Sequence, residues 1–558
     1  MGFMTPAPPD FDVERWLDQP YGERLRRTCA SWAMQGFGAP GVAYAFYVVK
    51  LGLYAGGFLL VASTTRGIGG VGDFGEWWSQ PIVFQKAVVW TLLFEVLGLG
   101  CASGPLTARY VPPITAPLYW FRPGTTRLAP FRWMPLTSGH RRSLVDVALY
   151  AAHLALLVRA LLAPEMTKAV VVPILVVFGL LGLRDKTIFL ASRSEHYLLA
   201  LFVFLFPGDF WAGEQAVQAA LWFGAATSKL NHHFPNVIAV MMSNNPLLRS
   251  GRARRALYRG YPDDLRGSRL VARIAHVATG VEYTFPLVLL LSDGGITTTV
   301  ALVVMVAFHS IILTSFPLGV PLEWNVFFVY SGLVLFGAHA EVDVWSIDSP
   351  LLIATLLVCL VVVPVVGNLR PDKVSFLMAM RYYAGNWGTS LWLWRPSALV
   401  KLDERITKAV DLPRRQLEGL YGEGAYEPTL GRVQAFRSMH LHGRALNQLL
   451  PRAIADLRDD EVTARGLDVF EVIDGELVAG ITLGWNFGEG HLHDERLLAA
   501  LQDQCDFAPG ELRCVFLESQ PAGRPTLHWR IADAAVGRIA EGEVAAAGLL
   551  DVQPWASL

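Results

Sequence analysis

Long apolar runs separated by short polar segments fill the first two-thirds of the chain. A helix needs about 20 mostly apolar residues to cross the hydrocarbon of a bilayer. The pattern therefore predicts a mainly α-helical, polytopic transmembrane bundle of about ten spans over residues 41–368, after an interfacial or cytoplasmic segment over 1–40. The runs lie at about 41–62, 82–102, 143–162, 169–183, 196–212, 216–231, 270–291, 296–318, 324–339 and 351–368, and the fourth and sixth are the weakest.

The loops between these runs alternate in charge. Lys and Arg collect in loops on the cytoplasmic side of a membrane. Three basic loops, 103–142, 184–193 and 249–269, fall on one side of a ten-span arrangement, and the loops on the other side are acidic or poor in charge. The alternation predicts a multi-pass protein of the cytoplasmic (inner) membrane with both termini in the cytoplasm.

The pattern changes after residue 369. Residues 369–396 are aromatic and basic, which is typical of a segment lying at the bilayer interface. Residues 397–558 contain polar helical patterns followed by short alternating segments, which predict a small cytoplasmic α+β domain. Within it, Asp474-Gly475 predicts a hairpin turn, and residues 534–547 predict a closing helix.

Composition narrows the class of protein. Of the 558 residues, 53% are hydrophobic and only 17% are charged, against about 25% charged in a typical soluble domain. This excludes a disordered or nucleic-acid-binding protein and argues against an ordinary soluble enzyme. The five cysteines include no CxxC pair, so they predict neither a disulfide framework nor a zinc site.

Many ionisable residues fall within or beside the predicted spans. Each costs at least ~2.5–3.5 kcal/mol inside a bilayer, so such groups face a partner or a wet cavity. Pairing of Lys50 with Glu95, or contact of Arg273 with lipid phosphate, would explain single members, but the whole set predicts a polar interior between helices. Its members are Lys50, Glu95, Asp146, His153, Glu195, His232, His233, Arg273, His276 and Glu282.

The densest candidate chemistry surrounds His196 and Lys229. A Lys in an apolar site can lose its proton and act as a base, and a nearby His can hold the same substrate. Alternatively, Lys229 marks the end of a helix, and His232 and His233 lie among the lipid headgroups. Seven histidines are scattered over the spans without repeated HxxxH boxes, so no metal site is predicted there. In the C-terminal domain, His491 and His493 are predicted to lie in an exposed polar loop; alternatively, they bind a metal with Glu489 and Asp494.

Two resemblances bear on function. The stretches KLGLYAGGFLL, QKAVVWTLLFEVLGLGCASGPLT and MRYYAGNW resemble an actinobacterial family of multi-pass membrane proteins of unknown function, over nearly the whole chain. More distantly, residues 140–340 resemble the horizontally transferred transmembrane (HTTM) domain of vitamin K-dependent gamma-carboxylases, through GAATSKL, EHYL and FHSIILTSFPLG.

The second resemblance implies site residues. It makes Lys229 the base and His196 its helper in chemistry on a reduced quinone, the one cofactor it suggests, and places His309 in the third motif. The carboxylases' substrate-binding region is not recognisable here, and HHFP replaces the usual continuation after the Lys motif, so carboxylation of protein glutamates is not expected.

Three functional hypotheses follow. The first is a membrane-embedded enzyme acting on a lipophilic substrate, such as a quinol, an isoprenoid or another lipid, at a buried Lys229, His196 and His309 site. The second is a transporter or carrier that uses the intramembrane acids and histidines. The third is a membrane scaffold or accessory subunit that docks a protein partner through its cytoplasmic domain.

Overall fold

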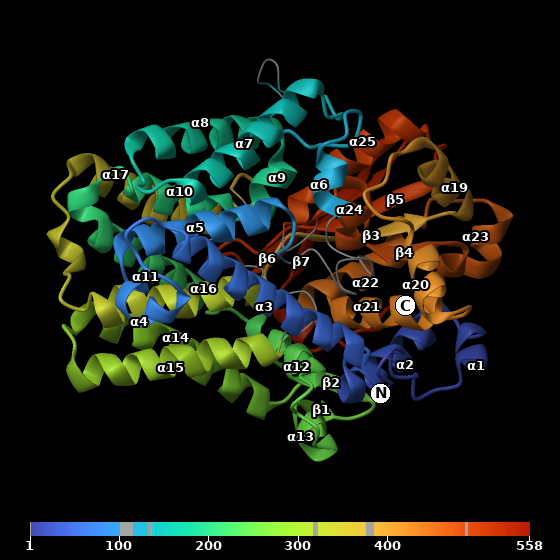
Figure 1. The fold of residues 1–558 in the computed structure, drawn as a ribbon. Coiled ribbons are helices and arrows are strands. Elements are labelled where there is room, and N and C mark those ends of the chain that lie inside the picture. The colour runs from blue at the N-terminus through green and yellow to red at the C-terminus, as the bar shows by residue number, and fades with distance from the viewer. Residues whose placement is uncertain are drawn as a thin grey trace.

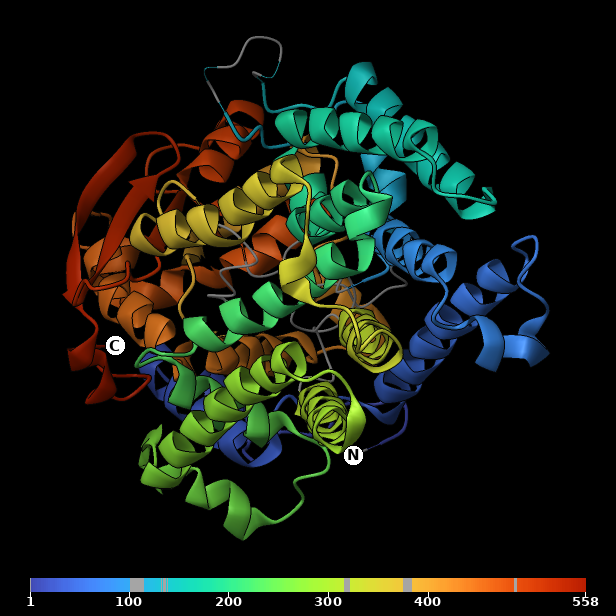
Figure 2. The same ribbon diagram turned by 90° about the vertical axis from the view of Figure 1, so that its left-hand side faces the viewer.

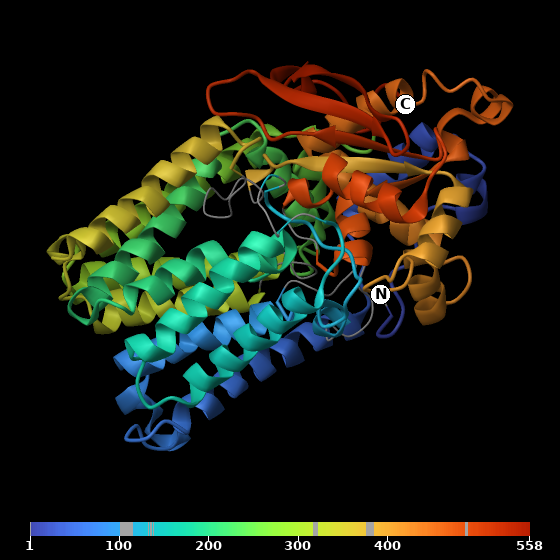
Figure 3. The same ribbon diagram turned by 90° about the horizontal axis from the view of Figure 1, so that it is seen from above.

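Apolar helices form a bundle with a mixed α+β domain at one end (Figure 1). The computed structural model describes residues 2–100, 115–131, 133, 137, 139–315, 322–374, 384–485 and 489–558. Figure 3 shows the long helices running side by side away from the C-terminal domain. We call the end of the bundle that meets this domain the domain end, and the opposite end the far end.

Five helices in the described residues are long and apolar enough to cross a membrane, which supports a multi-pass protein. A sixth candidate is a helix pair bent by 111°, formed by α10 (Ser194–Val203) and the segment Pro207–Ser228. The five are α3 (Gly41–Ser63), α7 (Leu144–Leu162), α14 (Arg269–Leu291), α15 (Gly295–Ser315) and the segment Pro350–Leu369, which consists of α17 (Pro350–Leu357), a π-helical turn (Val358–Val362) and α18 (Val363–Leu369).

The predicted count of about ten spans is therefore not supported. Several apolar runs contain a residue that ends the helix early: α5 (Pro81–Val96) stops before Gly98, which has a φ of 67°. The helix over the run at 169–183, α8 (Lys168–Arg184), ends at Asp185, whose side chain caps α9 (Lys186–Ala191). With 16 and 17 residues, α5 and α8 both fall short of the about 20 residues that a membrane span needs.

Most of the remaining membrane-domain elements are short, except α11 (Phe210–Ser228), which has 19 residues. The short ones are α4 (Phe74–Trp77), α6 (Thr115–Trp120), α12 (Phe234–Asn244), α13 (Gly251–Ala256), strands β1 (Tyr258–Gly260) and β2 (Asp264–Gly267), and α16 (Leu322–Leu333) with a π-helical turn (Val334–Ala338).

The N-terminal segment packs against the C-terminal domain, so the two lie on the same side of the bundle. It contains α1 (Val13–Leu17) and α2 (Tyr21–Gln35). The Trp32 ring lies 5.5 Å from that of Phe436, and Arg24 forms an ion pair with Asp468.

The described parts of the three basic loops also reach this side. Tyr119 Oη donates to the Thr482 carbonyl oxygen at 2.6 Å, and Lys186 Nζ lies 3.3 Å from Glu489 Oε1. The backbone N–H of Leu265 donates to Gln553 Oε1 at 3.1 Å. The loops predicted to share one side therefore lie together; that this side is cytoplasmic remains a prediction.

The C-terminal domain contains a five-stranded antiparallel sheet in the order β4-β3-β5-β6-β7, with helices packed around it. Figure 2 shows its strands at the edge of the molecule beside the bundle. The strands are β3 (Thr389–Trp394), β4 (Glu471–Asp474), β5 (Leu512–Leu517), β6 (Thr526–Asp533) and β7 (Gly537–Ala545). The helices are α19 (Pro396–Arg405), α20 (Pro413–Tyr421), α21 (Tyr426–Met439), α22 (Leu441–Ala453), α23 (Asp460–Arg465), α24 (Gly475–Leu483) and α25 (Glu495–Cys505).

Three local predictions in this part of the chain are wrong. Asp474 does not begin a hairpin turn: its side chain accepts from the Glu476 backbone N–H and caps α24. The predicted closing helix is the edge strand β7 instead. The aromatic residues of β3 are buried between β4 and β5 rather than placed at the bilayer interface, because the strand is internal to the sheet. Residues 375–383 of the same predicted segment lie outside the described residues.

Candidate functional site

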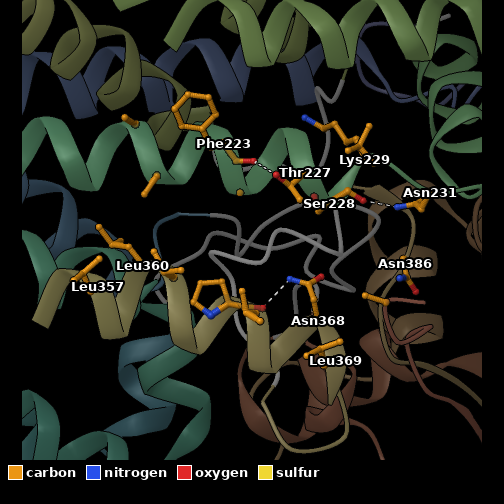
Figure 4. Close-up of a pocket in the computed structure, with 18 of the residues that line it drawn as sticks. Phe223, Thr227, Ser228, Lys229, Asn231, Leu357, Leu360, Asn368, Leu369 and Asn386 are labelled. Carbon is orange, nitrogen blue, oxygen red and sulfur yellow. Dashed lines mark hydrogen bonds between the residues drawn. The ribbon is translucent and has the colours of Figure 1, made fainter. Parts of the chain in front are cut away.

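A groove of about 1340 Å³ runs between α11 and the segment Pro350–Leu369. Its far end is lined by Trp345 and Ile347, and its domain end by Asn368 and the loop 520–524. Figure 4 shows α11 on one side, with Phe223 and Thr227, and α17–α18 on the other, with Leu357 and Leu360. The groove thus follows a membrane-length helix and ends at the α+β domain.

The α11 wall exists because small residues recur on one face of the helix. Ala216, Ala220, Gly224 and Ser228 are four residues apart and all line the groove. Residues at this spacing share a helical face, so the small side chains leave a continuous depression.

The opposite wall is apolar and uncovered. Leu357 is 56% exposed, and Val361 and Val365, each four residues further, are both 51% exposed. These three residues line the groove. Contiguous exposed apolar surface of this kind marks a binding groove or a lipid contact.

The domain end of the groove is polar. Hydrogen bonds there connect the helical bundle to the C-terminal domain. The Ala522 backbone N–H donates to the Asn368 carbonyl oxygen at 2.7 Å. Asn386 and Gln520 pair reciprocally: Asn386 Nδ2 donates to the Gln520 carbonyl oxygen at 3.0 Å, and the Gln520 N–H donates to Asn386 Oδ1 at 2.7 Å. Gln520 Oε1 also lies 2.8 Å from His233 Nε2.

Lys229 lines the groove, but its ammonium points to the other side of α11, away from Asn368 and Asn386 (Figure 4). There it forms an ion pair with the buried Glu282 of α14, while Lys229 itself is partly buried. Lys229 and Glu282 also line a second, small cavity of about 150 Å³, together with His309 and Asn325. Two predicted site residues, Lys229 and His309, are therefore brought together.

His309 is hydrogen-bonded at both ring nitrogens. Trp222 Nε1 donates to His309 Nε2 at 3.1 Å, and His309 Nδ1 lies 2.9 Å from Asn325 Oδ1. Because an indole N–H only donates and an amide oxygen only accepts, these partners fix a neutral imidazole protonated at Nδ1. A ring held this way orients its neighbours and has no nitrogen left for proton transfer.

His196 does not line either cavity. Its buried ring lies 5.6 Å from that of Phe328, and the centroid of the Phe328 ring lies 5.8 Å from that of His309. No hydrogen-bond partner of His196 Nδ1 is found in the structure as described. Phe328, which lines the small cavity, is thus a neighbour of both histidines, while His196 itself stays outside the cavity lining. Glu195, its neighbour in the sequence, is also buried, whereas Phe316 and Pro317 of the third predicted motif lie outside the described residues.

A second buried ionic cluster contains Lys50 and Glu95, both predicted to lie within the membrane. Lys50 Nζ lies 3.4 Å from Glu323 Oε2, and Glu95 pairs with Arg193. The predicted Lys50–Glu95 pair is therefore replaced by two pairs. Their partners were missed because Arg193 lies in a loop, with a φ of 47°, and Glu323 lies in the first turn of α16.

The other predicted polar positions divide between buried and exposed. Asp146 accepts from Arg184 Nε at 2.5 Å, and His153 stacks on Phe178 with ring centroids 4.4 Å apart. Arg273 and His276 are exposed, as is His232. His232 and His276 nevertheless line the groove.

His233 instead turns into the domain boundary. Its ring is buried and lies 4.8 Å from that of His442. The adjacent histidines thus face different environments: His232 lines the groove, and His233 lies at the domain boundary.

The predicted exposed loop containing His491 and His493 is in fact buried. His491 lies between two carboxylates, with Nδ1 2.9 Å from Glu489 Oε1 and Nε2 2.8 Å from Glu518 Oε2. Burial disfavours the charged imidazole, but the two carboxylates outweigh it and raise the pKa of His491 to about 9. Within the described ranges, no group of three or more His, Cys, Asp or Glu residues is arranged to hold a metal ion.

Comparison with known families then places the chain. Residues 1–557 match the model of a family described as transmembrane protein of unknown function (DUF3556). The chain belongs to this family. No curated protein and no solved structure matches it. The family description supports a transmembrane protein in contact with the bilayer, while the resemblance to the HTTM domain remains a prediction.

One pattern in the sequence indicates the groove but was not among our predictions. Small residues every fourth position from Ala216 to Ser228 lie opposite apolar residues at the same spacing from Leu357 to Val365. Their pairing across space, however, depends on how α11 and α17 pack, which periodicity does not reveal.

Proposed function

We propose that this membrane protein binds an amphipathic lipid in the groove, with the apolar chain between α11 and α17–α18 and the polar head at the domain end. The observation that carries the proposal is the polarity gradient along one cavity: exposed Leu357, Val361 and Val365 lead to Asn368, Asn386 and Gln520. Ligand pockets are mostly apolar, with a few polar groups that fix the orientation.

The dimensions suit a chain-like molecule. The wall formed by Pro350–Leu369 has 20 residues, which as a helix is about 30 Å long, the thickness of the hydrocarbon core. A long acyl or isoprenoid chain could lie along it without leaving the apolar region. Quinols and isoprenoids, which the resemblance suggests, belong to this class.

A catalytic role forms a second candidate, favoured by the position of Lys229 between the groove and the small cavity. An ammonium paired with a carboxylate has no lone pair with which to act as a base. The arrangement of Lys229, Glu282 and His309 therefore supports a role in holding a negative or polar group better than one in proton abstraction. His196 lines neither the groove nor the small cavity, so its action on a reduced quinone would first require access to one of them.

Photocrosslinking tests the binding proposal. The purified full-length protein is exposed to a lipid that carries a photoreactive group along its chain, and labelled peptides are identified by mass spectrometry. We expect labels on both walls, in residues 216–230 and 353–369. Ala220→Trp, which fills the groove, should abolish them, whereas Ala307→Trp on the exposed face of α15 should not. Equal labelling of both variants would overturn the proposal.

A further inference from the structure

We infer that the lipid in the groove carries an anionic head group, a phosphate or a carboxylate, held at the domain end by Arg524. The inference rests on the proposed function, because it presumes a ligand whose chain lies in the groove. It concerns the charge of the head, which the apolar walls do not determine.

The Lys and Arg side chains that line the groove have no acidic counterpart in its lining. They are Arg524 and Lys229, and none of the described lining residues is Asp or Glu. In a chain with nearly equal numbers of acidic and basic residues, 48 and 47, this separation gives the groove a positive potential. An anion is favoured there, and a cationic head would meet no carboxylate.

Arg524 is the lining cation that remains available. The charge of Lys229 is matched by Glu282 on the other side of α11. The exposed Arg524 side chain, by contrast, has neither an ion pair nor a side-chain hydrogen bond in the part of the chain described here. A free guanidinium can form two parallel hydrogen bonds to a phosphate or carboxylate.

The loop that carries Arg524 is fixed in place. The Arg524 backbone N–H donates to the Pro521 carbonyl oxygen at 3.1 Å, closing a turn in which Gly523 has a φ of 74°, a conformation that favours glycine. The Ala522 N–H holds the same loop to the end of α18. The guanidinium is therefore presented at the mouth of the groove by an anchored backbone.

The neighbouring groups complete a site for a polar anion. Asn231 and Asn386 line the groove near the same end, and Figure 4 shows them on the side of Asn368. His232 is exposed and also lines the groove. Asn231 Nδ2 donates to the Ser228 carbonyl oxygen and Asn386 Nδ2 to that of Gln520, so each amide has one further hydrogen for an oxygen of the head group.

Binding measurements with three single-chain probes and phosphatidylcholine test the inference. The full-length protein in a neutral detergent is titrated with oleate, oleyl phosphate and oleyl alcohol, which share one chain and differ in the head. We expect oleate or oleyl phosphate to bind at least tenfold more tightly than the alcohol, because hydrogen bonds to a charged group are stronger than those to a neutral hydroxyl. Arg524→Gln should remove this advantage and leave binding of the alcohol unchanged.

The outcomes separate the two proposals. Arg252→Gln, an exposed arginine outside the groove, should change nothing. If the alcohol and the anions bind equally and Arg524→Gln has no effect, the head-group inference fails while the groove proposal stands. If none of the three binds, or if Ala220→Trp does not weaken the alcohol, the groove proposal itself fails. A preference for oleyl phosphate over oleate identifies the anion as a phosphate, and the reverse preference identifies it as a carboxylate. Tighter binding of phosphatidylcholine than of either anion would overturn the inference.

Discussion

Lys229 at the end of α11 forms an ion pair with the buried Glu282 of α14. The pair joins two membrane helices beside the groove and brings a predicted catalytic residue into contact with a carboxylate from another span. It explains how an ammonium and a carboxylate are tolerated together among apolar side chains: each supplies the counter-charge that the other lacks.

Removing one member of this pair should destabilise the protein more than removing both. Lys229→Met leaves the Glu282 carboxylate buried without a partner, which costs ~3–5 kcal/mol. The double variant Lys229→Met, Glu282→Leu should regain most of that loss. Thermal unfolding of the purified protein in detergent measures both.

The matched control is Lys373→Met, which breaks an exposed pair with Asp372 at 3.5 Å and should have little effect. A double variant no more stable than Lys229→Met alone would show that the pair does not form.

The hydrogen bonds of His309 predict a structural role. His309→Phe keeps a ring of similar shape but leaves Trp222 Nε1 and Asn325 without their partner. We expect a loss of ~1–3 kcal/mol in the free energy of unfolding, because a buried polar group without a hydrogen bond carries its desolvation cost. The exposed His276→Phe serves as the comparison, and equal stability of the two variants would argue against the bonded tautomer.

Stability should fall at alkaline pH because of His491. The pKa of this imidazole is raised to about 9, against about 6.5 in an unfolded chain. A raised pKa stabilises the fold fully below about pH 6.5, and the contribution disappears as the pH rises through 9, a change of ~3 kcal/mol. Melting temperatures of the full chain at pH 6.5, 8 and 9.5 test this.

His491→Gln should remove the part of the pH dependence between these values and leave other titrations in place. A variant whose melting temperature changes with pH as steeply as that of the unsubstituted chain would contradict the buried, charged state of His491.

Asp474 should matter more than an ordinary helix cap. It caps α24 through the Glu476 N–H at 2.8 Å and also accepts from Arg437 Nη2 at 3.1 Å, with both side chains buried. Asp474→Ala therefore removes a cap worth ~1 kcal/mol. It also removes a carboxylate that balances the charge of the buried Arg437 guanidinium.

Asp494→Ala, at the cap of α25, is the matched comparison because its partner Arg496 is partly exposed. We expect Asp474→Ala to lower the melting temperature clearly more than Asp494→Ala does. Similar losses would mean that the Arg437 contact adds nothing.

Much of the architecture follows from local patterns. The apolar runs near 41–62, 143–162, 270–291, 296–318 and 351–368 correspond to the five long helices, and the C-terminal change in composition corresponds to the α+β domain. The failure at Asp474-Gly475 has a clear cause: this pair can form either a hairpin turn or a helix cap, and packing rather than local sequence selects between them.

The candidate site was predictable in part. Lys229 and His309 line the same small cavity, as their intramembrane position suggested. That Lys229 would meet Glu282, and Glu95 would meet Arg193, could not be inferred, because ion pairing depends on which helices are neighbours. The groove depends on the same tertiary arrangement.

The lipid content of the protein purified from its own membranes tests the central proposal most directly. Mass spectrometry gives the number of amphipathic lipid molecules retained per protein after extensive detergent washing. We predict about one retained molecule in the unsubstituted protein and in Ala307→Trp, and a loss of most of it in Ala220→Trp at unchanged melting temperature. Equal retention by all three proteins, or none by any of them, would contradict the assignment of the groove as a lipid site.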